Sequence, residues 1–166
     1  METVVVDLNL CPFAKRELVN NRVRFSLTNA TTEKALLQAQ RAELALLERN
    51  PSVETTLLIH PDVLQDFYEY NQFLDCAEAL LAEMELEGVY QIAGFHPLYQ
   101  FAGTGPDDVE NYTNRSPYPL LHFIREDSLE RAIANHPDVS GIPTRNIELM
   151  NSMGVERLRS LLQACF

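Results

Sequence analysis

The sequence predicts an α/β domain in which helices pack on a small mixed or parallel sheet. Segments with the two-residue period of strands alternate with segments that have the 3.6-residue period of helices over the first 95 residues. The chain has 166 residues, 46% of them hydrophobic, which is enough for the core of one domain over residues 1–166. The C-terminal part is helical without this alternation, so a two-layer α+β sandwich is the alternative.

The first elements follow from β-branched residues, a proline and a two-residue period. Residues 3–6 favour a short strand, with a helix entering the turn at 9–12 as the alternative. Pro12 suits the first turn of a helix over residues 13–19. Residues 22–27 alternate apolar and polar side chains, which is typical of a half-buried strand.

A second strand is expected between two helices. Thr31 or Thr32 is placed to cap a helix that ends at Arg49, and residues 54–60 have strand chemistry. The helix after this strand has the clearest pattern in the chain. Its apolar residues step by three and four positions and share one face: Val63, Phe67, Tyr70, Leu74, Ala77, Leu81 and Met84.

The sequence also contains candidate residues for beginning and ending that helix. Asp62 followed by Gln65 resembles a capping box, and Gly88 is placed to end the helix. Cys76 lies beside the apolar stripe, so we expect it to be a small core residue.

The second half contains a long loop between two expected strands. Residues 89–95 predict a third strand, and residues 120–125 predict a strand or a helical turn. The polar loop at 96–119 contains four prolines and two glycines, and long ordered loops are often functional. Helices are expected over the remainder, at 127–135, 143–154 and 155–162.

Composition narrows the class of partner. Thirteen basic residues against twenty-four acidic ones give a net charge of −11. This field repels phosphates and anionic lipids, so we expect no nucleic-acid and no membrane partner. The chain opens without a basic, apolar leader, and its three cysteines do not indicate a disulfide framework. We therefore expect a cytoplasmic protein.

Residues 96–125 concentrate the polar groups that a site needs. His96 follows a predicted strand directly, where ligands gather in open α/β sheets. We interpret His96 and His122 as acid–base groups, because histidine titrates near neutral pH, and Asp107 and Asp108 as carboxylates that orient them. The structural alternative is a satisfied histidine at a strand end and aspartates in turns.

The same four side chains are alternatively metal ligands. Their nitrogen and oxygen atoms suit zinc, iron or manganese. Their spacing matches no established motif, since the chain has neither a His-x-x-x-His nor a Cys-x-x-Cys pattern. The sequence leaves the metal and any other cofactor unknown.

Arginine and asparagine side chains in this region are candidates for holding a substrate. Arg115 and Arg125 are expected to hold a carboxylate or phosphate through two-pronged contacts. Asn111 and Asn114 are expected beside them. Alternatively, these groups bond loop backbone or neighbouring carboxylates and only order the loop.

Cys11 is a second candidate site, as a reactive thiol. It stands before a predicted helix, whose dipole, with Lys15 or Arg16, would favour the thiolate. The strand-Cys-Pro-x-x-helix layout resembles the start of a glutaredoxin, with Ala14 in place of the second cysteine. The alternative is a buried structural cysteine.

Two histidine–proline pairs stand at strand ends, at His60-Pro61 and His96-Pro97. If their strands run parallel, both corners lie at the same edge of the sheet. The alternative is two unrelated turns.

Several short motifs occur together in this sequence. They are residues 9–14 (NLCPFA), 95–97 (FHP), 101–104 (FAGT), 106–119, 121–122, 125–126 and 145–147 (RNI). Together they resemble the bacterial family catalogued as domain of unknown function 1415, over nearly the whole chain. The resemblance implies kinship and a bacterial source, and it implies no activity.

Three functions remain open from the sequence. The first is an enzyme that acts on a small anionic polar molecule by His/Asp acid–base chemistry, with or without a metal, and it requires these side chains to converge in one cleft. The second is a non-catalytic small-ligand-binding or regulatory domain, and the third is a thiol-redox protein that uses Cys11. The sequence indicates no oligomeric state.

Overall fold

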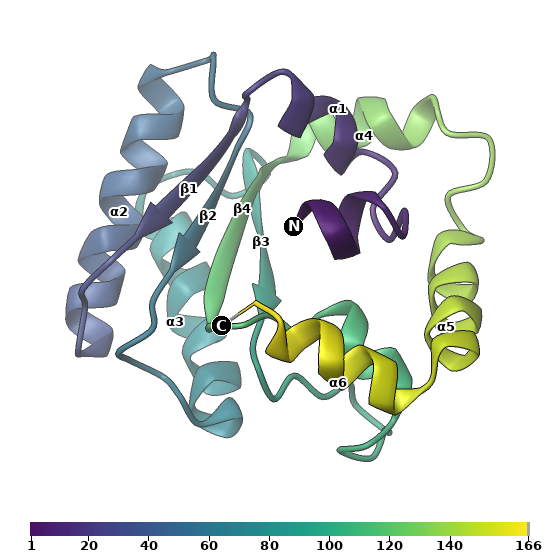
Figure 1. The fold of residues 1–166 in the computed structure, drawn as a ribbon. Coiled ribbons are helices and arrows are strands. Elements are labelled where there is room, and N and C mark those ends of the chain that lie inside the picture. Colours follow the sequence, from purple (N-terminus) through teal and green to yellow (C-terminus); the bar gives the residue numbers. More distant parts are fainter. Residues whose placement is uncertain (166) are drawn as a thin grey trace.

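A four-stranded mixed sheet in the order β1-β2-β4-β3 forms the centre of the computed structural model, which describes residues 1–165 (Figure 1). β1 (Val23–Leu27) runs parallel to β2 (Thr55–Ile59). β4 (Leu120–Arg125) runs antiparallel to β2 and to β3 (Tyr90–Phe95). The α/β class expected from the sequence is confirmed, with a mixed sheet.

One face of the sheet is covered by α2 (Glu33–Arg49) and α3 (Phe67–Glu83) (Figure 1). Thr32 begins α2, since its Oγ1 accepts a hydrogen bond of 3.2 Å from the Ala35 N–H. Fully buried side chains join the sheet to these helices: Leu36, Leu44, Leu47, Leu58, Tyr70, Leu121 and Phe123. Burial of each such side chain contributes about 1.5–3 kcal/mol, so this layer holds the main core.

The other face is bordered by a second layer of helical elements (Figure 1). They are the π-type turn η1 (Glu2–Val6), α1 (Ala14–Val19), the 3₁₀ turn η2 (Val109–Thr113), α4 (Glu126–Ala134), α5 (Ile142–Met153) and α6 (Val155–Gln163). Four buried residues give this layer its own small core: Leu10, Tyr112, Met150 and Leu158. Two separate cores therefore lie on opposite sides of the sheet.

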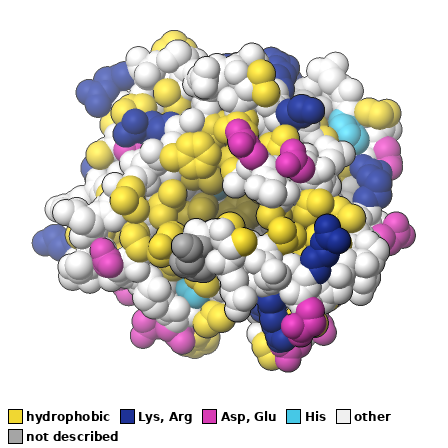
Figure 2. Space-filling model, in the orientation of Figure 1, with side chains coloured by type: hydrophobic (Ala, Val, Ile, Leu, Met, Phe, Trp, Pro, Cys, Tyr) yellow, Lys and Arg dark blue, Asp and Glu magenta, His cyan; other side chains and the backbone are white. Residues whose placement is uncertain are grey.

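Strand alternation decides which side chains meet the second layer. Leu121 and Phe123 of β4 are fully buried against α2 and α3, so the intervening His122 points to the opposite face. On that face, Phe25 and Leu27 of β1 are 51% and 73% exposed. Figure 2 shows hydrophobic side chains gathered around a hollow on this side of the molecule.

Two sequence predictions about the first elements differ from the structure. The strand expected at residues 3–6 is wrong, and the helical alternative is the one that forms. The Val5 and Asp7 N–H groups donate to the carbonyls of Met1 and Glu2 (both 2.9 Å), and Val4 packs on the second core. Local hydrogen bonds and this apolar contact therefore outweigh the strand preference of β-branched residues.

The limits expected for α3 are also wrong. The helix is capped by Asp66, whose Oδ1 accepts from the Tyr68 and Glu69 N–H groups at 2.9 and 3.0 Å, and not by Asp62. It ends at Glu83, because Glu85 takes a positive φ of 61° and turns the chain before Gly88. Cys76 is exposed on this helix and is not a core residue.

The remaining helices and strands match their expected segments within a few residues, and residues 120–125 form a strand. Gly154 ends α5 with a φ of 74°, a conformation that glycine adopts at no steric cost. Among the described residues, no helix has both the length and the hydropathy that crossing a bilayer requires.

Candidate functional site

His96 is a buried histidine whose two ring nitrogens are both hydrogen-bonded to backbone. Its Nδ1 accepts from the Leu98 N–H at 3.0 Å, so the hydrogen is on Nε2, which donates to the Leu64 carbonyl at 3.1 Å. Burial lowers the pKa of His96 and keeps the ring neutral. The residue lines neither of the two large cavities described below.

The two histidine–proline corners do lie at one edge of the sheet. β2 and β3 are both antiparallel to β4, so they run in the same direction. The rings of His60 and His96 lie 5.9 and 5.0 Å from the ring of Tyr70, centroid to centroid. His60 is fully buried, which lowers its pKa to about 4, and its Nε2 has no partner among the described residues. This cluster consists of aromatic rings packed around Tyr70, and its polar atoms other than His60 Nε2 bond to backbone groups.

The two aspartates lie away from the histidines that they were expected to orient. Asp107 is exposed and accepts from Arg159 of α6 at 2.7 Å. Asp108 accepts from the Gly105 N–H at 2.7 Å and so closes a turn. Over residues 1–165, no group of three His, Cys, Asp or Glu side chains has the arrangement of a metal site.

The asparagines and Arg115 order the loop from within. Asn111 accepts from the Phe101 N–H and donates to the Gly105 carbonyl, at 3.0 and 2.8 Å. Asn114 donates to the Gly94 carbonyl at 3.1 Å, and Thr113 contacts its Oδ1. Arg115 donates to the carbonyls of Tyr99 and Pro106 and stacks on Tyr112 at 4.4 Å.

His122 and Arg125 lie on opposite faces of β4. The Arg125 guanidinium donates to Tyr90 Oη at 2.7 Å and to the carbonyls of Leu47 and Val53 at 2.6 and 3.3 Å, beside α2. Through Nη1 and Nη2 it joins β3, β4 and α2, which is a structural role. His122 points to the face beneath the second layer and lines the hollow there, which Arg125 also borders.

Thr55 fixes the tautomer of His122. Thr55 Oγ1 lies 2.6 Å from His122 Nε2 and donates its hydrogen to the Phe123 carbonyl at 2.6 Å. The hydroxyl must therefore accept from Nε2–H, which leaves Nδ1 without a hydrogen. No described residue bonds Nδ1. Burial lowers the pKa of His122 to about 4, so the ring is neutral at neutral pH.

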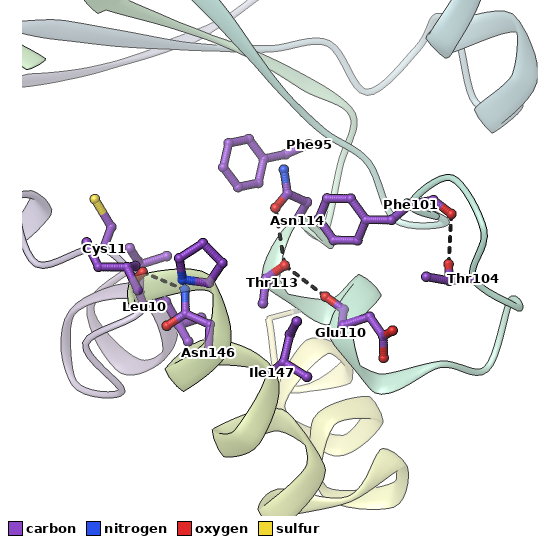
Figure 3. Close-up of a pocket in the computed structure, with 13 residues that line it drawn as sticks. Leu10, Cys11, Phe95, Phe101, Thr104, Glu110, Thr113, Asn114, Asn146 and Ile147 are labelled. Atoms are coloured by element: carbon purple, nitrogen blue, oxygen red, sulfur yellow. Dashed lines mark hydrogen bonds between the residues drawn. The ribbon is translucent and has the colours of Figure 1, made fainter. Parts of the chain in front are cut away.

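Two neighbouring cavities fill the space between the sheet and the second layer. The larger, of about 600 Å³, is lined by His122, Thr55, Cys11 and residues of α1 and α4. The smaller, of about 560 Å³, is lined by Cys11, Asn114 and apolar residues of the loop and α5 (Figure 3). Figure 3 shows the sulfur of Cys11 directed away from Asn146, and the Phe95 and Phe101 rings on either side of Asn114. Cys11 is thus the residue that both cavities share.

The comparisons with known proteins give one result. The family described as "Protein of unknown function (DUF1415)" matches residues 1–160. The chain belongs to this family. No curated protein and no solved structure matches it.

Cys11 of this DUF1415 chain lies just before a helix, as predicted, but that helix is short. Its carbonyl accepts from the Ala14 N–H at 3.1 Å, so the residue lies in the turn before α1. That helix has six residues, too few for a strong dipole at Cys11. The thiol is half-buried against the cavities, whereas Cys76 and Cys165 are exposed.

The hollow of this DUF1415 protein, which comprises the two cavities, is also lined by side chains that were not among the site residues predicted from the sequence. Thr55 orients His122, and Arg131 and His136 border the larger cavity from α4 and the residues after it. The strand chemistry of residues 54–60 was a signal for Thr55, because side chains alternate along a strand and Thr55 then shares one face with Leu57 and Ile59. No comparable sequence pattern indicated that Arg131 and His136 border a cavity.

Proposed function

We propose that the protein is an enzyme that acts on a small anionic molecule in the hollow between the sheet and the second layer. In this proposal, His122 accepts a proton at Nδ1 and Cys11 is the nucleophile. The observation that carries it is that the cavity bordered by His122, with its unprotonated Nδ1, is also lined by the Cys11 thiol. This joins the acid–base and thiol hypotheses in one site.

His122 has the orientation that a proton acceptor needs, although its low pKa makes it a weak base until charge develops beside it. Its ring is oriented by Thr55, its Nε2 is occupied, and its lone pair at Nδ1 is available to a ligand. The pKa of about 4 keeps the ring unprotonated at neutral pH. A negative charge that develops in the cavity during reaction raises this pKa and favours proton transfer.

The step that these residues support is thiol addition to a carbonyl group. The Cys11 sulfur forms a bond to the carbonyl carbon while the C=O electron pair moves to oxygen. The thiol proton passes to His122 Nδ1, directly or across the bound ligand. Return of that proton to the oxygen gives the neutral thiol adduct and restores the neutral ring. Where the carbon carries a leaving group, the C=O bond re-forms as the bond to that group breaks, and the departing group takes the proton from His122.

A non-catalytic ligand-binding domain is the second candidate function. The mostly apolar lining of the smaller cavity favours it, because such a lining can hold a ligand by burying its apolar surface. In that case His122 and Thr55 form a polar contact with the ligand and Cys11 has no special reactivity.

Competitive alkylation of the three cysteines tests the proposal. Limiting iodoacetamide at neutral pH, followed by mass spectrometry of the three cysteine peptides, gives relative rates within one molecule. We expect Cys11 to react faster than Cys76 and Cys165, although it is less exposed than both. His122→Gln is expected to remove this advantage while the protein stays folded by circular dichroism. A Cys11 that reacts more slowly than both, with and without His122, would contradict the proposal.

A further inference from the structure

The α4 side of the larger cavity presents hydrogen-bond donors. Ser128, Arg131 and His136 all border this cavity. Arg131 Nη2 donates to Ser128 Oγ at 2.8 Å. Within residues 1–165, its guanidinium makes no ion pair with a carboxylate.

His136 adds an N–H group beside this arginine. Its Nδ1 accepts from the Asp138 N–H at 3.2 Å, so the ring hydrogen is on Nε2. The ring packs edge-on against Phe13, at 5.7 Å between centroids, and Phe13 lines the same cavity. His136 and His122 thus have opposite roles at this cavity: Nε2–H of His136 is a donor, and Nδ1 of His122 is an acceptor.

The other lining arginines already have partners. Arg16 pairs with Glu17 at 3.3 Å, and Arg22 lies between Glu17 and Glu54. Arg125 donates to Tyr90 Oη and to the Leu47 carbonyl on the opposite face of the sheet. Among the described arginines that line this cavity, Arg131 is therefore the one that neither pairs with a carboxylate nor donates to the opposite face of the sheet, in a chain of net charge −11.

The adjoining cavity has the opposite character. Its lining is mostly apolar: Val5, Leu10, Phe95, Phe101, Ile142, Pro143 and Ile147. Each cavity falls in the range of about 300–1,000 Å³ that is typical of small-molecule sites. Because Cys11 borders both, a single ligand that passes Cys11 would meet donors at one end and apolar side chains at the other.

We propose that the ligand is an amphipathic carboxylate. Its carboxylate is held by Arg131, with His136 Nε2–H as a second donor, and its apolar body passes Cys11 into the smaller cavity. Guanidinium and carboxylate groups match in shape and charge, which favours this anion over a neutral amide. This inference rests on the proposed function, since it concerns the substrate of the same hollow.

Titration of the ¹⁵N-labelled protein with hexanoate, hexanamide, hexylamine and acetate tests the ligand class by NMR. We expect hexanoate to shift signals of the cavity residues and to bind at least about tenfold more tightly than the other three. Arg131→Gln is expected to weaken hexanoate binding about tenfold and to leave hexanamide unchanged. Arg49→Gln, an exposed arginine that lines neither cavity, is the matched control.

A second pair of variants tests the apolar end. Ile147 lines the smaller cavity and Ile133 lines neither, and both are 41% exposed. Ile147→Asp is expected to weaken hexanoate binding about tenfold, with no effect of Ile133→Asp. Equal binding of hexanoate and hexylamine, or full hexanoate binding by Arg131→Gln, would overturn the inference. Hexanoate binding without fast Cys11 alkylation would contradict only the proposed chemistry, and fast alkylation without hexanoate binding only the ligand class.

Discussion

The Thr55 hydroxyl lies 2.6 Å from His122 Nε2 and an equal 2.6 Å from the Phe123 carbonyl oxygen. The carbonyl can only accept, so the single hydroxyl hydrogen goes to it and the imidazole must donate. Thr55 thereby decides which nitrogen of His122 is left without a hydrogen and can accept a proton from a molecule in the hollow. Strand pairing places it there, because Thr55 and His122 lie on neighbouring strands β2 and β4 and on the same face.

Replacement of this threonine by valine removes the hydroxyl and keeps the shape. We expect Thr55→Val to mix the two tautomers of His122, which the wild-type protein holds as Nε2–H. Loss of a buried hydrogen bond should lower the free energy of unfolding by about 1–3 kcal/mol. Long-range ¹H–¹⁵N NMR of the ring and urea denaturation measure both effects. Thr55→Ser keeps the hydroxyl and is the control; a single Nε2–H tautomer in Thr55→Val would contradict the assignment.

The low pKa of His122 makes stability depend on pH. Burial lowers this pKa from 6.5 to about 4, so between these values the unfolded chain binds a proton that the folded protein does not. Acidification across this window therefore destabilises the fold, by about 3 kcal/mol for His122 alone. His60 adds a loss of the same sign.

The His122→Gln variant separates these two contributions. We expect its free energy of unfolding to fall less than that of the wild type between about pH 7 and pH 4, because His60 and His96 still contribute but His122 no longer does. Urea denaturation at several pH values measures the slope. Identical slopes for the two proteins would show that His122 titrates normally.

The α/β class and most helices and strands could be predicted because they depend on local periodicity. The exceptions have causes that the periodicity does not contain. Asp62 and Asp66 are both acceptable caps, and the choice of Asp66 follows from the turn at Leu64, which has a positive φ of 58°. Val4, within residues 3–6, packs on a core that includes Tyr112, Met150 and Leu158, all more than 100 residues away.

The candidate site was harder to predict because side-chain orientation depends on the sheet. Arg125 and His122 are close in sequence, and only the knowledge that residues 120–125 form a strand puts them on opposite faces. The proximity of Cys11 to α4 depends on how the second layer folds back over the sheet. No local pattern in the sequence contains that information.

Tyr70 and Gly94 form a contact that should be energetically coupled. Tyr70 Oη donates to the Leu120 carbonyl at 2.8 Å and accepts from the Phe95 N–H at 3.0 Å, so α3 is tied to β3 and β4. A Cβ atom at Gly94 would lie 2.8 Å from the same oxygen. We expect Tyr70→Phe and Gly94→Ala each to lower the free energy of unfolding by about 1–3 kcal/mol.

The double variant distinguishes a direct clash from two independent losses. Without the hydroxyl, the nearest Tyr70 atom to the added Cβ is ring carbon Cε1 at 3.4 Å, close to ordinary contact. Gly94→Ala should therefore cost less in the Tyr70→Phe background than in the wild type. A thermodynamic cycle of urea denaturation curves measures this difference, and strict additivity would contradict the contact.

Asn111 is the residue that holds the loop wall of the smaller cavity in place. It is fully buried, its Oδ1 accepts from the Phe101 N–H and Thr104 Oγ1, and its Nδ2 donates to the Gly105 carbonyl. Asn111→Asp keeps the shape but replaces the donor with a negatively charged oxygen that faces this carbonyl. We expect a loss of about 1–3 kcal/mol, concentrated in the loop.

Hydrogen exchange can locate that loss. The Phe101 amide should exchange faster in Asn111→Asp than in the wild type, while amides of β2 stay protected. Asn151→Asp is the matched control, because Asn151 makes the same kind of amide-to-carbonyl bond, at 2.9 Å to Ile147, but is exposed on α5. Since Phe101 and Thr104 line the smaller cavity, the same variant should also bind hexanoate more weakly. Unchanged protection of Phe101 would show that Asn111 does not support this wall.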